Sequence, residues 1–354
     1  MWWLWIVLGV VALAVVLMAL VGSYFFKLTV VRGPRDKERT EEEMFQGDSP
    51  TWKPEHQKAK DCADWIRANG ELIPLTAYDG LKLQGYFIDA EHAKGTIIAF
   101  HGYRSQATVD FAPEAPFFHE QGYRVILPYQ RSHGKSDGEF ITYGAKERYD
   151  ARDWAKLAAA RWPGEDIFLA GISMGCATVT MASDLELPGE VRGIIADCGF
   201  TSAWEEMAYL CKVQYHIPAG PILAVLNLFT KSKAGFGLKE GDSRVSLAKT
   251  KLPVLFIHGE ADDFVPPYMT QQSYEACRSE KELLTVPGAA HAKSYVTDPE
   301  TCQQRMKAFF DKHGTGKAGI RSWDHRPAEA GNSGRTGNTR EEDSHGPGTY
   351  PQYD

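Results

Sequence analysis

A serine lies between two glycines in the segment Gly171-Ile172-Ser173-Met174-Gly175. A serine hydroxyl attacks acyl carbons when a neighbouring base removes its proton and a third group orients that base. A short apolar run precedes the segment, as in a buried strand, and small apolar residues follow it, as in a helix packed on a sheet. On its own the pentapeptide also fits a glycine-rich turn with an incidental serine. Between a strand and a helix it is the pattern of a nucleophile elbow, which predicts Ser173 as a nucleophile.

Three aspartates are candidates for the group that orients the base. In sheets of parallel strands, functional residues gather where the strands end, which restricts the search to loops after strand-like runs. Asp262 and its neighbour Asp263 follow the apolar run 254–257, and Asp197 ends the run 191–196. The residues alone leave the choice among these three carboxylates open.

One histidine and two backbone amides complete the candidate chemistry. His291 lies in a loop of small residues after the run 283–286, at the edge where the other strands end, so it is the candidate base. The oxyanion that develops in acyl transfer needs backbone N–H donors. Met174, the residue after the nucleophile, supplies one donor, and Tyr103, in the loop after the run 96–100, is the candidate for the other.

The elements that must position these residues alternate along the chain. An Asp-Gly turn at Asp79-Gly80 predicts a hairpin of segments 72–76 and 81–88. Apolar, strand-like runs follow at 96–100, 124–127, 167–170, 191–196, 254–258 and 283–286. Helical patterns lie at 54–68, 111–121, 145–160, 176–182, 267–277 and 298–310. This alternation predicts an α/β fold with a mostly parallel central sheet and helices on both faces, in a domain spanning residues 53–313.

A long excursion at about residues 204–246 interrupts the alternation. It separates two strands by far more than an ordinary crossover and includes the apolar run 217–226. The run is too apolar for a disordered loop and too short for a second membrane span. We expect a helical cap over the site with an apolar pocket beneath it; extra helices packed on the body are the alternative.

The first 27 residues have the composition of a transmembrane anchor. No charged residue occurs from Trp2 to Phe26, and a helix of that length is about 37 Å long, enough to cross roughly 30 Å of hydrocarbon. A cleaved signal peptide fits less well, because there is no basic segment before the apolar run. Lys and Arg follow the helix, so the positive-inside rule places the catalytic part in the cytoplasm of a single-pass membrane protein.

Charge and composition narrow the possible partners. The net charge of -7 argues against a nucleic-acid partner, which requires a basic face. Six scattered cysteines suit free thiols, and neither metal-ligand spacing nor a cofactor motif is present. Residues 28–52 are predicted to be a linker, and residues 314–354, which have almost no aliphatic side chains, a disordered tail.

From about Leu72 to Phe310 the chain resembles a serine α/β-hydrolase. In particular, it is similar to membrane-anchored bacterial hydrolases related to the serine aminopeptidase and prolyl-oligopeptidase-like groups. The resemblance is carried by five segments, namely Phe100-His101-Gly102-Tyr103, Gln130-Arg131-Ser132-His133-Gly134-Lys135-Ser136, Gly171 to Gly175, His258-Gly259-Glu260-Ala261-Asp262, and His291. It implies the α/β-hydrolase fold and a Ser-Asp-His catalytic triad in that chain order.

The resemblance also implies the role of each site residue. Ser173 is the nucleophile and His291 the base, while Asp262, the fifth residue of the family's H-G-x-x-D segment, is preferred to Asp263. Tyr103 and Met174 form the oxyanion hole. The loop from Arg131 to Ser136 is expected to have a structural role or to line the edge of the substrate site.

The expected function is hydrolysis of carboxylic esters, or related acyl bonds, through an acyl-serine intermediate. The anchor and the apolar cap favour small-molecule substrates with hydrophobic or lipid-derived acyl groups, without a cofactor. The family also includes thioesterases, lipases and peptidases. The alternatives are therefore a serine peptidase or aminopeptidase, an acyltransferase, and a non-catalytic membrane-tethered scaffold.

Overall fold

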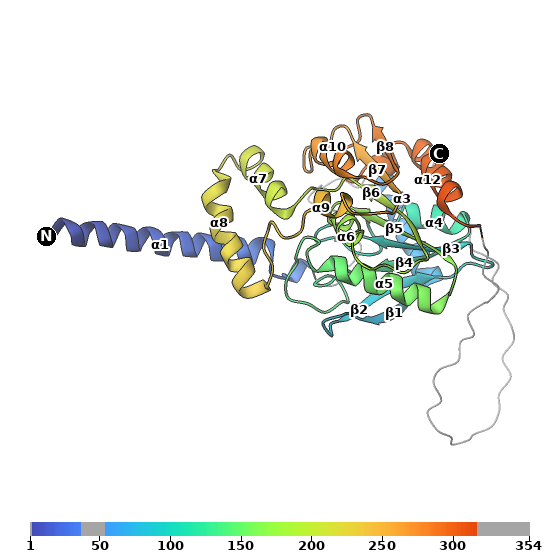
Figure 1. Ribbon diagram of the computed structural model, residues 1–354, viewed down its shortest axis with the longest axis horizontal. Helices are drawn as coiled ribbons and strands as arrows, with labels where there is room; N and C mark the ends of the chain where they lie inside the picture. Colours follow the sequence, from blue (N-terminus) through green and yellow to red (C-terminus); the bar gives the residue numbers. More distant parts are fainter. Residues whose placement is uncertain (1, 37–53, 317–354) are drawn as a thin grey trace, which may run out of the picture.

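The computed structural model describes residues 2–36 and 54–316, whose core is an eight-stranded sheet (Figure 1). The strand order is β1-β2-β4-β3-β5-β6-β7-β8, with β2 antiparallel to both of its neighbours and all other pairs parallel. The predicted mostly parallel sheet is thus confirmed. The strands are β1 (Gly70–Thr76), β2 (Lys82–Ile88), β3 (Gly95–Phe100), β4 (Tyr123–Pro128), β5 (Asp166–Ile172), β6 (Val191–Asp197), β7 (Val254–Gly259) and β8 (Lys281–Val286).

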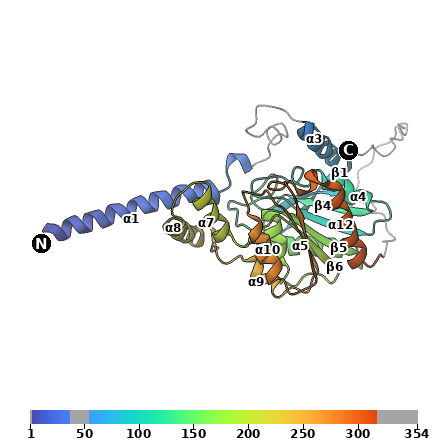
Figure 2. The ribbon, with the colours of Figure 1, turned by 90° about the horizontal axis from the view of Figure 1, so that it is seen from above.

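Helices cover both faces of the sheet, as predicted (Figures 1 and 2). One face packs against α3 (Pro54–Asn69), α4 (Glu114–Glu120), α11 (Ser294–Thr297) and α12 (Pro299–His313). The other face packs against α5 (Glu147–Arg161), α6 (Met174–Ala182), α9 (Ser243–Leu247) and α10 (Pro267–Ala276). The side chains of β5 alternate between the two layers: Phe168 and Ala170 belong to the first core, and Ile167 and Leu169 to the second. This alternation explains why every residue of β5 is buried.

A third apolar cluster lies apart from the sheet. The excursion at 204–246 forms α7 (Ala203–Val213), α8 (Ala219–Phe229), a π-helical turn η2 (Thr230–Ala234) and the start of α9. In Figure 1, α7 and α8 stand beside the body, and α8 lies across the carboxyl-terminal part of α1 (Trp2–Thr29). Their side chains pack together with the elbow residue Met174.

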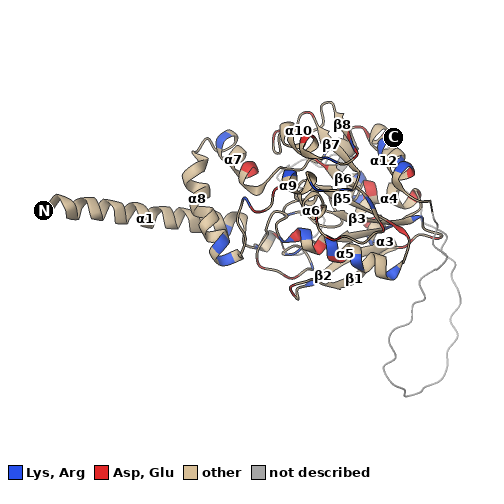
Figure 3. Ribbon diagram, in the orientation of Figure 1, with Lys and Arg blue, Asp and Glu red and all other residues tan. Residues whose placement is uncertain are grey.

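The helix α1 is apolar and extends away from the body (Figures 1 and 2). Among the described residues, it is the one helix long and apolar enough to cross a membrane. Residues 2–17 are all exposed, and Figure 3 shows no charged residue along this part of the helix. After α1 the chain returns to the body through the short helix η1 (Pro34–Asp36). Most of the predicted linker (28–52) and the predicted tail (314–354) lie outside the described residues.

Candidate active site

Ser173 occupies a sharp turn between β5 and α6. Its backbone has φ 56° and ψ −115°, a conformation that non-glycine residues rarely adopt. A Cβ at Gly175 would lie 1.7 Å from the Phe100 carbonyl oxygen, and a Cβ at Gly171 would lie 2.2 Å from the Gly175 oxygen. Both flanking positions therefore require glycine, because the turn packs directly against its own backbone and that of β3.

The structure brings the three sequence-predicted side chains into one hydrogen-bonded chain. His291 Nε2 lies 3.0 Å from Ser173 Oγ, and His291 Nδ1 lies 2.7 Å from Asp262 Oδ2. Ser173 follows β5, Asp262 follows β7 and His291 follows β8, so parallel strands deliver all three residues to the same sheet edge. This is the geometry in which a histidine can remove the serine proton while a carboxylate orients the ring.

The other two candidate aspartates do not contact His291 through a hydrogen bond among the described residues. Asp263 is exposed to solvent. The buried carboxylate of Asp197 instead accepts a hydrogen bond from Ser294 Oγ (3.4 Å), and the Asp197 main-chain oxygen accepts from the Ser173 N–H (2.9 Å). Burial raises the pKa of Asp197 to about 6. Asp262 is thus the aspartate whose geometry suits the orienting role.

The carboxylate of Asp262 is surrounded by donors. Oδ1 accepts hydrogen bonds from the N–H groups of Phe264 (3.0 Å) and Val265 (2.9 Å), and Oδ2 lies 3.2 Å from His258 Nε2. Burial by itself would raise the pKa of Asp262, but the hydrogen bonds from His258 and His291 lower it to about 2. The carboxylate is therefore ionised at neutral pH, as the partner of an imidazole must be.

His258 is a site residue to which sequence reasoning assigned no role. Its ring is buried, with Nδ1 2.7 Å from Thr270 Oγ1 and Nε2 2.9 Å from the Val265 oxygen. Through these contacts the His258 ring stabilises the loop that carries Asp262. The signal was present in the sequence, because His258 opens the H-G-x-x-D segment that ends at Asp262.

The loop after β3 leaves one amide available beside the nucleophile. The Gly102 N–H donates to Asp110 Oδ2 (2.6 Å), and the Arg104 N–H donates to His133 Nε2 (3.0 Å). Between them, the N–H of Tyr103 donates to none of the described residues, and neither does the N–H of Met174 at the start of α6. A Cβ at Gly102 would lie 3.3 Å from Ser173 Cβ, so this loop approaches the serine closely. Both predicted oxyanion donors are thus unoccupied amides near Ser173.

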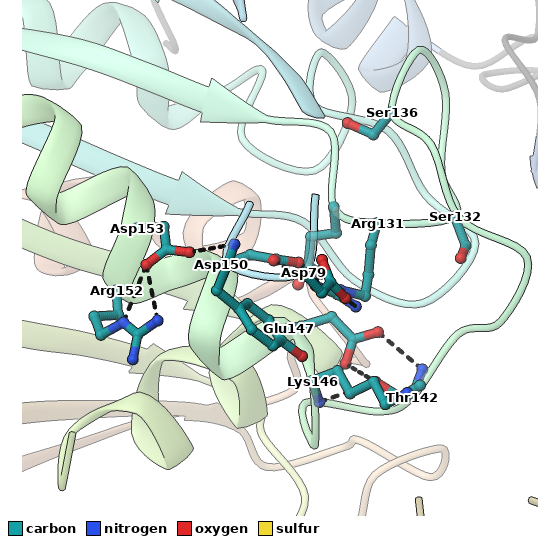
Figure 4. Close-up of polar contacts among 12 residues, drawn as sticks. Asp79, Arg131, Ser132, Ser136, Thr142, Lys146, Glu147, Asp150, Arg152 and Asp153 are labelled. Carbon is teal, nitrogen blue, oxygen red and sulfur yellow. Dashed lines mark hydrogen bonds and ion pairs between the residues drawn. The ribbon is translucent and has the colours of Figure 1, made fainter. Parts of the chain in front are cut away.

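Ion pairs and hydrogen bonds hold the loop that contains Arg131 and Thr142 (Figure 4). Arg131 contacts Asp150 (2.6 Å) and Asp79 (2.8 Å), and Glu147 accepts from the N–H groups of Thr142 (2.8 Å) and Gly144 (2.9 Å). These contacts fix the segment 129–144, which includes His133. Through His133, the Arg131 to Ser136 loop contacts the backbone amide of Arg104.

A cavity of about 740 Å³ opens in front of Ser173. Its lining is mostly apolar and comes from three regions: the end of α1, the loops around Ser173, and the cap helices α7 and α8. The cap residues that line it include Met207, Leu210, Cys211, Ile222, Leu223 and Leu226. The volume and the apolar lining are those of a small-molecule site.

Glu206 of α7 is a buried carboxyl group in this apolar lining. Neither of its oxygens has a hydrogen-bond partner among the described residues. Burial, and to a smaller extent the charge of Asp262, raises the pKa of Glu206 well above its ordinary value. Burial therefore favours the neutral form of Glu206, which can both donate and accept a hydrogen bond. The sequence offered no signal for it beyond its position in the cap.

One group of potential metal ligands overlaps the site. Single ligand atoms of Cys198, Asp262 and His291 lie within 4.8 Å of one another. Burial, together with Asp197 and Asp262, raises the pKa of the Cys198 thiol well above its usual range, whereas a metal ligand must be a thiolate. Because Asp262 and His291 are already hydrogen-bonded to each other, the arrangement suits proton transfer better than metal binding.

Known proteins resemble this chain in sequence. The family model described as serine aminopeptidase, S33, matches residues 91–234. The uncharacterised protein YqkD of Bacillus subtilis is 29% identical over 244 residues, which cover 68% of this chain and 78% of that protein. The bifunctional esterase/perhydrolase DCH of Acinetobacter calcoaceticus is 20% identical over 280 residues, covering 67% of this chain and 98% of that one.

Solved structures share the fold. The esterase Pf2001 of Pyrococcus furiosus superimposes with a TM-score of 0.57 and 23% identity, covering 75% of this chain and 95% of that one. At this identity the likeness concerns the fold alone. Together with the family model and the relatives, it supports a hydrolase. The matched family and the matched folds agree, and both support the resemblance of this chain to the serine α/β-hydrolase superfamily.

Proposed function

We propose that this protein is a serine hydrolase that cleaves carboxylic esters through an acyl-serine intermediate. The observation that carries the proposal is the hydrogen-bonded chain from Ser173 Oγ through His291 to Asp262, at 3.0 Å and 2.7 Å. The unoccupied amides of Tyr103 and Met174 beside Ser173, and the esterases among its relatives and structural neighbours, support it further.

The reaction proceeds in two halves. His291 Nε2 accepts the proton of Ser173 Oγ as the oxygen attacks the acyl carbon, and the N–H groups of Tyr103 and Met174 stabilise the resulting oxyanion. The protonated histidine then donates to the leaving alcohol as the ester bond breaks. Water repeats the attack with His291 as its base, the acyl–Oγ bond breaks, and the proton returns to Ser173. The ionised Asp262 holds the imidazole and stabilises its protonated form.

The pocket favours hydrophobic acyl groups. Most of its lining consists of aliphatic and aromatic side chains from α1, α7 and α8, which would enclose an alkyl or aryl acid. We propose esters of hydrophobic or lipid-derived acids as the substrate class.

A second candidate function is aminopeptidase activity, and Glu206 is the observation that favours it. A substrate amine beside this carboxyl group would favour its ionised form and pair with it, whereas an ester needs only a hydrogen bond from the neutral form. A panel of acyl esters of graded length, compared with aminoacyl amides and dipeptides, separates the two. Faster turnover of aminoacyl amides than of every ester would reverse our order of preference.

The mechanism is tested by active-site labelling. A fluorophosphonate should label Ser173, and Ser173→Ala should abolish labelling and lower kcat for p-nitrophenyl esters by on the order of 10⁶. Ser183→Ala, at the other end of α6, is the matched control and should retain both. Unchanged ester turnover in Ser173→Ala would refute the mechanism.

We further propose that residues 1–27 anchor the hydrolase domain (53–313) to the cell membrane in a single pass. The length and composition of α1 support this, as does the basic sequence after it, which favours a cytoplasmic catalytic domain. A reporter that is active only in the cytoplasm should give a signal when it is fused to the carboxyl terminus, and a reporter that is active only outside the cytoplasm should not. A signal from an extracytoplasmic reporter would contradict the orientation.

A further inference from the structure

The end of α1 forms one wall of the active-site cavity. Phe25, Leu28 and Thr29 line the same cavity as Ser173, together with apolar residues of α7 and α8. Contact between α1 and α8 is close: a Cβ at Gly22 would lie 2.3 Å from Val225 Cγ1. The aromatic rings of Phe26 and Phe229 also pack with their centroids 6.1 Å apart. The pocket is therefore bounded by the helix that was expected only to anchor the protein.

The last carbonyl of α1 is bonded to the loop beside Ser173. The hydroxyl groups of Tyr103 and Tyr143 both donate to the Thr29 oxygen, at 2.9 Å and 2.6 Å, and the two rings stack with centroids 5.3 Å apart. Carbonyls at the end of a helix have no partner within the helix, so the two phenols supply the missing donors. Tyr103 thus carries both a candidate oxyanion amide and a side chain tied to α1.

Arg104 extends this connection to the residues after α1. Its guanidinium donates to the oxygens of Leu28 (2.9 Å) and Val31 (3.2 Å), pairs with the buried carboxylate of Asp36, and donates through Nε to the Tyr103 hydroxyl (2.7 Å). Four contacts from one side chain fix the Tyr103–Arg104 turn against the end of α1 and the residues that follow it.

Residues 30–36, which we call the strap, also contact the loop at 129–144. Arg32 donates to the oxygens of Gly134 (2.6 Å) and Ser136 (2.7 Å), and the Gly134 N–H donates to the Asp36 oxygen (2.7 Å). The Ile141 N–H donates to the Val30 oxygen (2.8 Å). The strap is therefore fixed to the loop that itself holds the Arg104 amide through His133.

We propose that the end of α1 and the strap are a working part of the active site: Leu28 and Phe25 wall the acyl-chain pocket, and the contacts to Tyr103 and Arg104 position the oxyanion loop. This inference rests on the proposed ester hydrolysis, because it assigns the pocket to the acyl chain. The physical reason is geometric, since an oxyanion donor acts only within about 2.7–3.1 Å of the developing charge. Leu28 and Phe25 are specificity-determining residues, and the Tyr103 hydroxyl has a positioning role.

The pocket wall is tested with two matched substitutions on the same helix of the full chain. Leu28→Trp narrows the cavity, and kcat/KM for p-nitrophenyl dodecanoate should fall about tenfold more than the value for the acetate, because the long chain reaches this wall. Leu20→Trp introduces the same side chain two turns earlier, at a position that does not line the cavity, and should leave both values unchanged. If the ratio of kcat/KM for the dodecanoate to that for the acetate were the same in the two variants, Leu28 would not form the wall of the acyl-chain pocket.

The positioning role is tested by removing one hydroxyl group. Tyr103→Phe keeps the ring and the backbone N–H but loses the bond to the Thr29 oxygen, so kcat for the acetate should fall by about three- to tenfold at constant KM, less than the loss of a whole donor. Tyr295→Phe removes a buried hydroxyl that accepts from Gln303 Nε2 (2.7 Å), and should leave kcat unchanged. A lower melting temperature with an unchanged kcat in Tyr103→Phe would mean a structural role and overturn positioning.

A labelling experiment separates this inference from the proposed activity. Dodecanoic acid with a terminal diazirine should cross-link to residues 25–28 in the wild type and equally in Ser173→Ala, since binding requires no reaction. If the protein hydrolyses esters but the cross-links lie only outside α1, the inference that α1 walls the pocket is wrong and the proposed ester hydrolysis still stands. Cross-links on α1 in a protein without esterase activity would refute the proposed function while supporting the wall.

Discussion

The two sides of the active site are built from different kinds of structure. The side that carries Ser173, Asp262 and His291 consists of strand ends, where backbone contacts and hydrogen bonds leave little freedom. The side that forms the pocket consists of α1, α7 and α8; of the eleven residues of α8, only Leu223 and Leu226 are buried. The predicted catalytic side chains are thus held by the core of the domain, whereas much of the cavity wall is formed by helices outside it.

The largest effect should come from the strand side, at the orienting carboxylate. Asp262→Asn removes the charge that holds His291, so kcat for p-nitrophenyl acetate should fall by about 10⁴. Asp263→Asn, at the exposed neighbouring position, should leave kcat close to the wild-type value. If kcat fell equally in the two variants, Asp262 would not be the residue that orients His291. The contrast between the strand ends and the helices around the site would then be weaker.

A pair of glycine substitutions compares the packing of the two sides directly. Gly175→Ala forces a Cβ against the Phe100 oxygen, so the free energy of unfolding should fall by more than about 3 kcal/mol. Gly220→Ala in α8 meets no atom within 4 Å and should stabilise the protein by up to about 1 kcal/mol. Denaturant unfolding measures both. A tolerated alanine at 175 would show that the elbow relaxes more than its contacts indicate.

The smallest effect concerns Glu206 on the helical side and depends on pH. Its pKa is raised in the folded protein, so above the ordinary pKa of a glutamate the unfolded chain releases a proton that the folded chain retains. The wild type is therefore destabilised as pH rises, whereas Glu206→Gln is not. The variant should gain unfolding free energy relative to the wild type at pH 8 and less at pH 5. An equal difference at both values would show that Glu206 is ionised when buried.

Much of the strand side could be predicted from the sequence, because it depends on local patterns. Apolar runs located the strands, and the ends of β5, β7 and β8 indicated where Ser173, Asp262 and His291 would meet. The choice of Asp262 needed the family resemblance, since Asp263 and Asp197 satisfied the same local rule. The helix predicted from residue 111 begins at Glu114 instead, after Pro113, whose fixed backbone suits the start of a helix.

The contacts of the helical side could not be predicted in this way. Tyr103 and Tyr143 both donate a hydrogen bond to the Thr29 oxygen, although they lie 74 and 114 positions after Thr29 in the sequence. No periodicity in the sequence predicts such distant contacts. Glu206 is one glutamate in an amphipathic helix, and its burial follows from the packing of α7 over the site. Such features depend on how distant elements meet rather than on any local pattern.

If α1 is the proposed membrane anchor, its exposed length determines how close the active site lies to the membrane. Residues 2–17, which are exposed throughout, make a helix about 24 Å long, whereas the hydrocarbon layer is roughly 30 Å thick. A spanning α1 must therefore include residues near Gly22, where α8 crosses it. The part of the cavity wall that Phe25 and Leu28 form would then lie beside the hydrocarbon layer, close to the lipid headgroups.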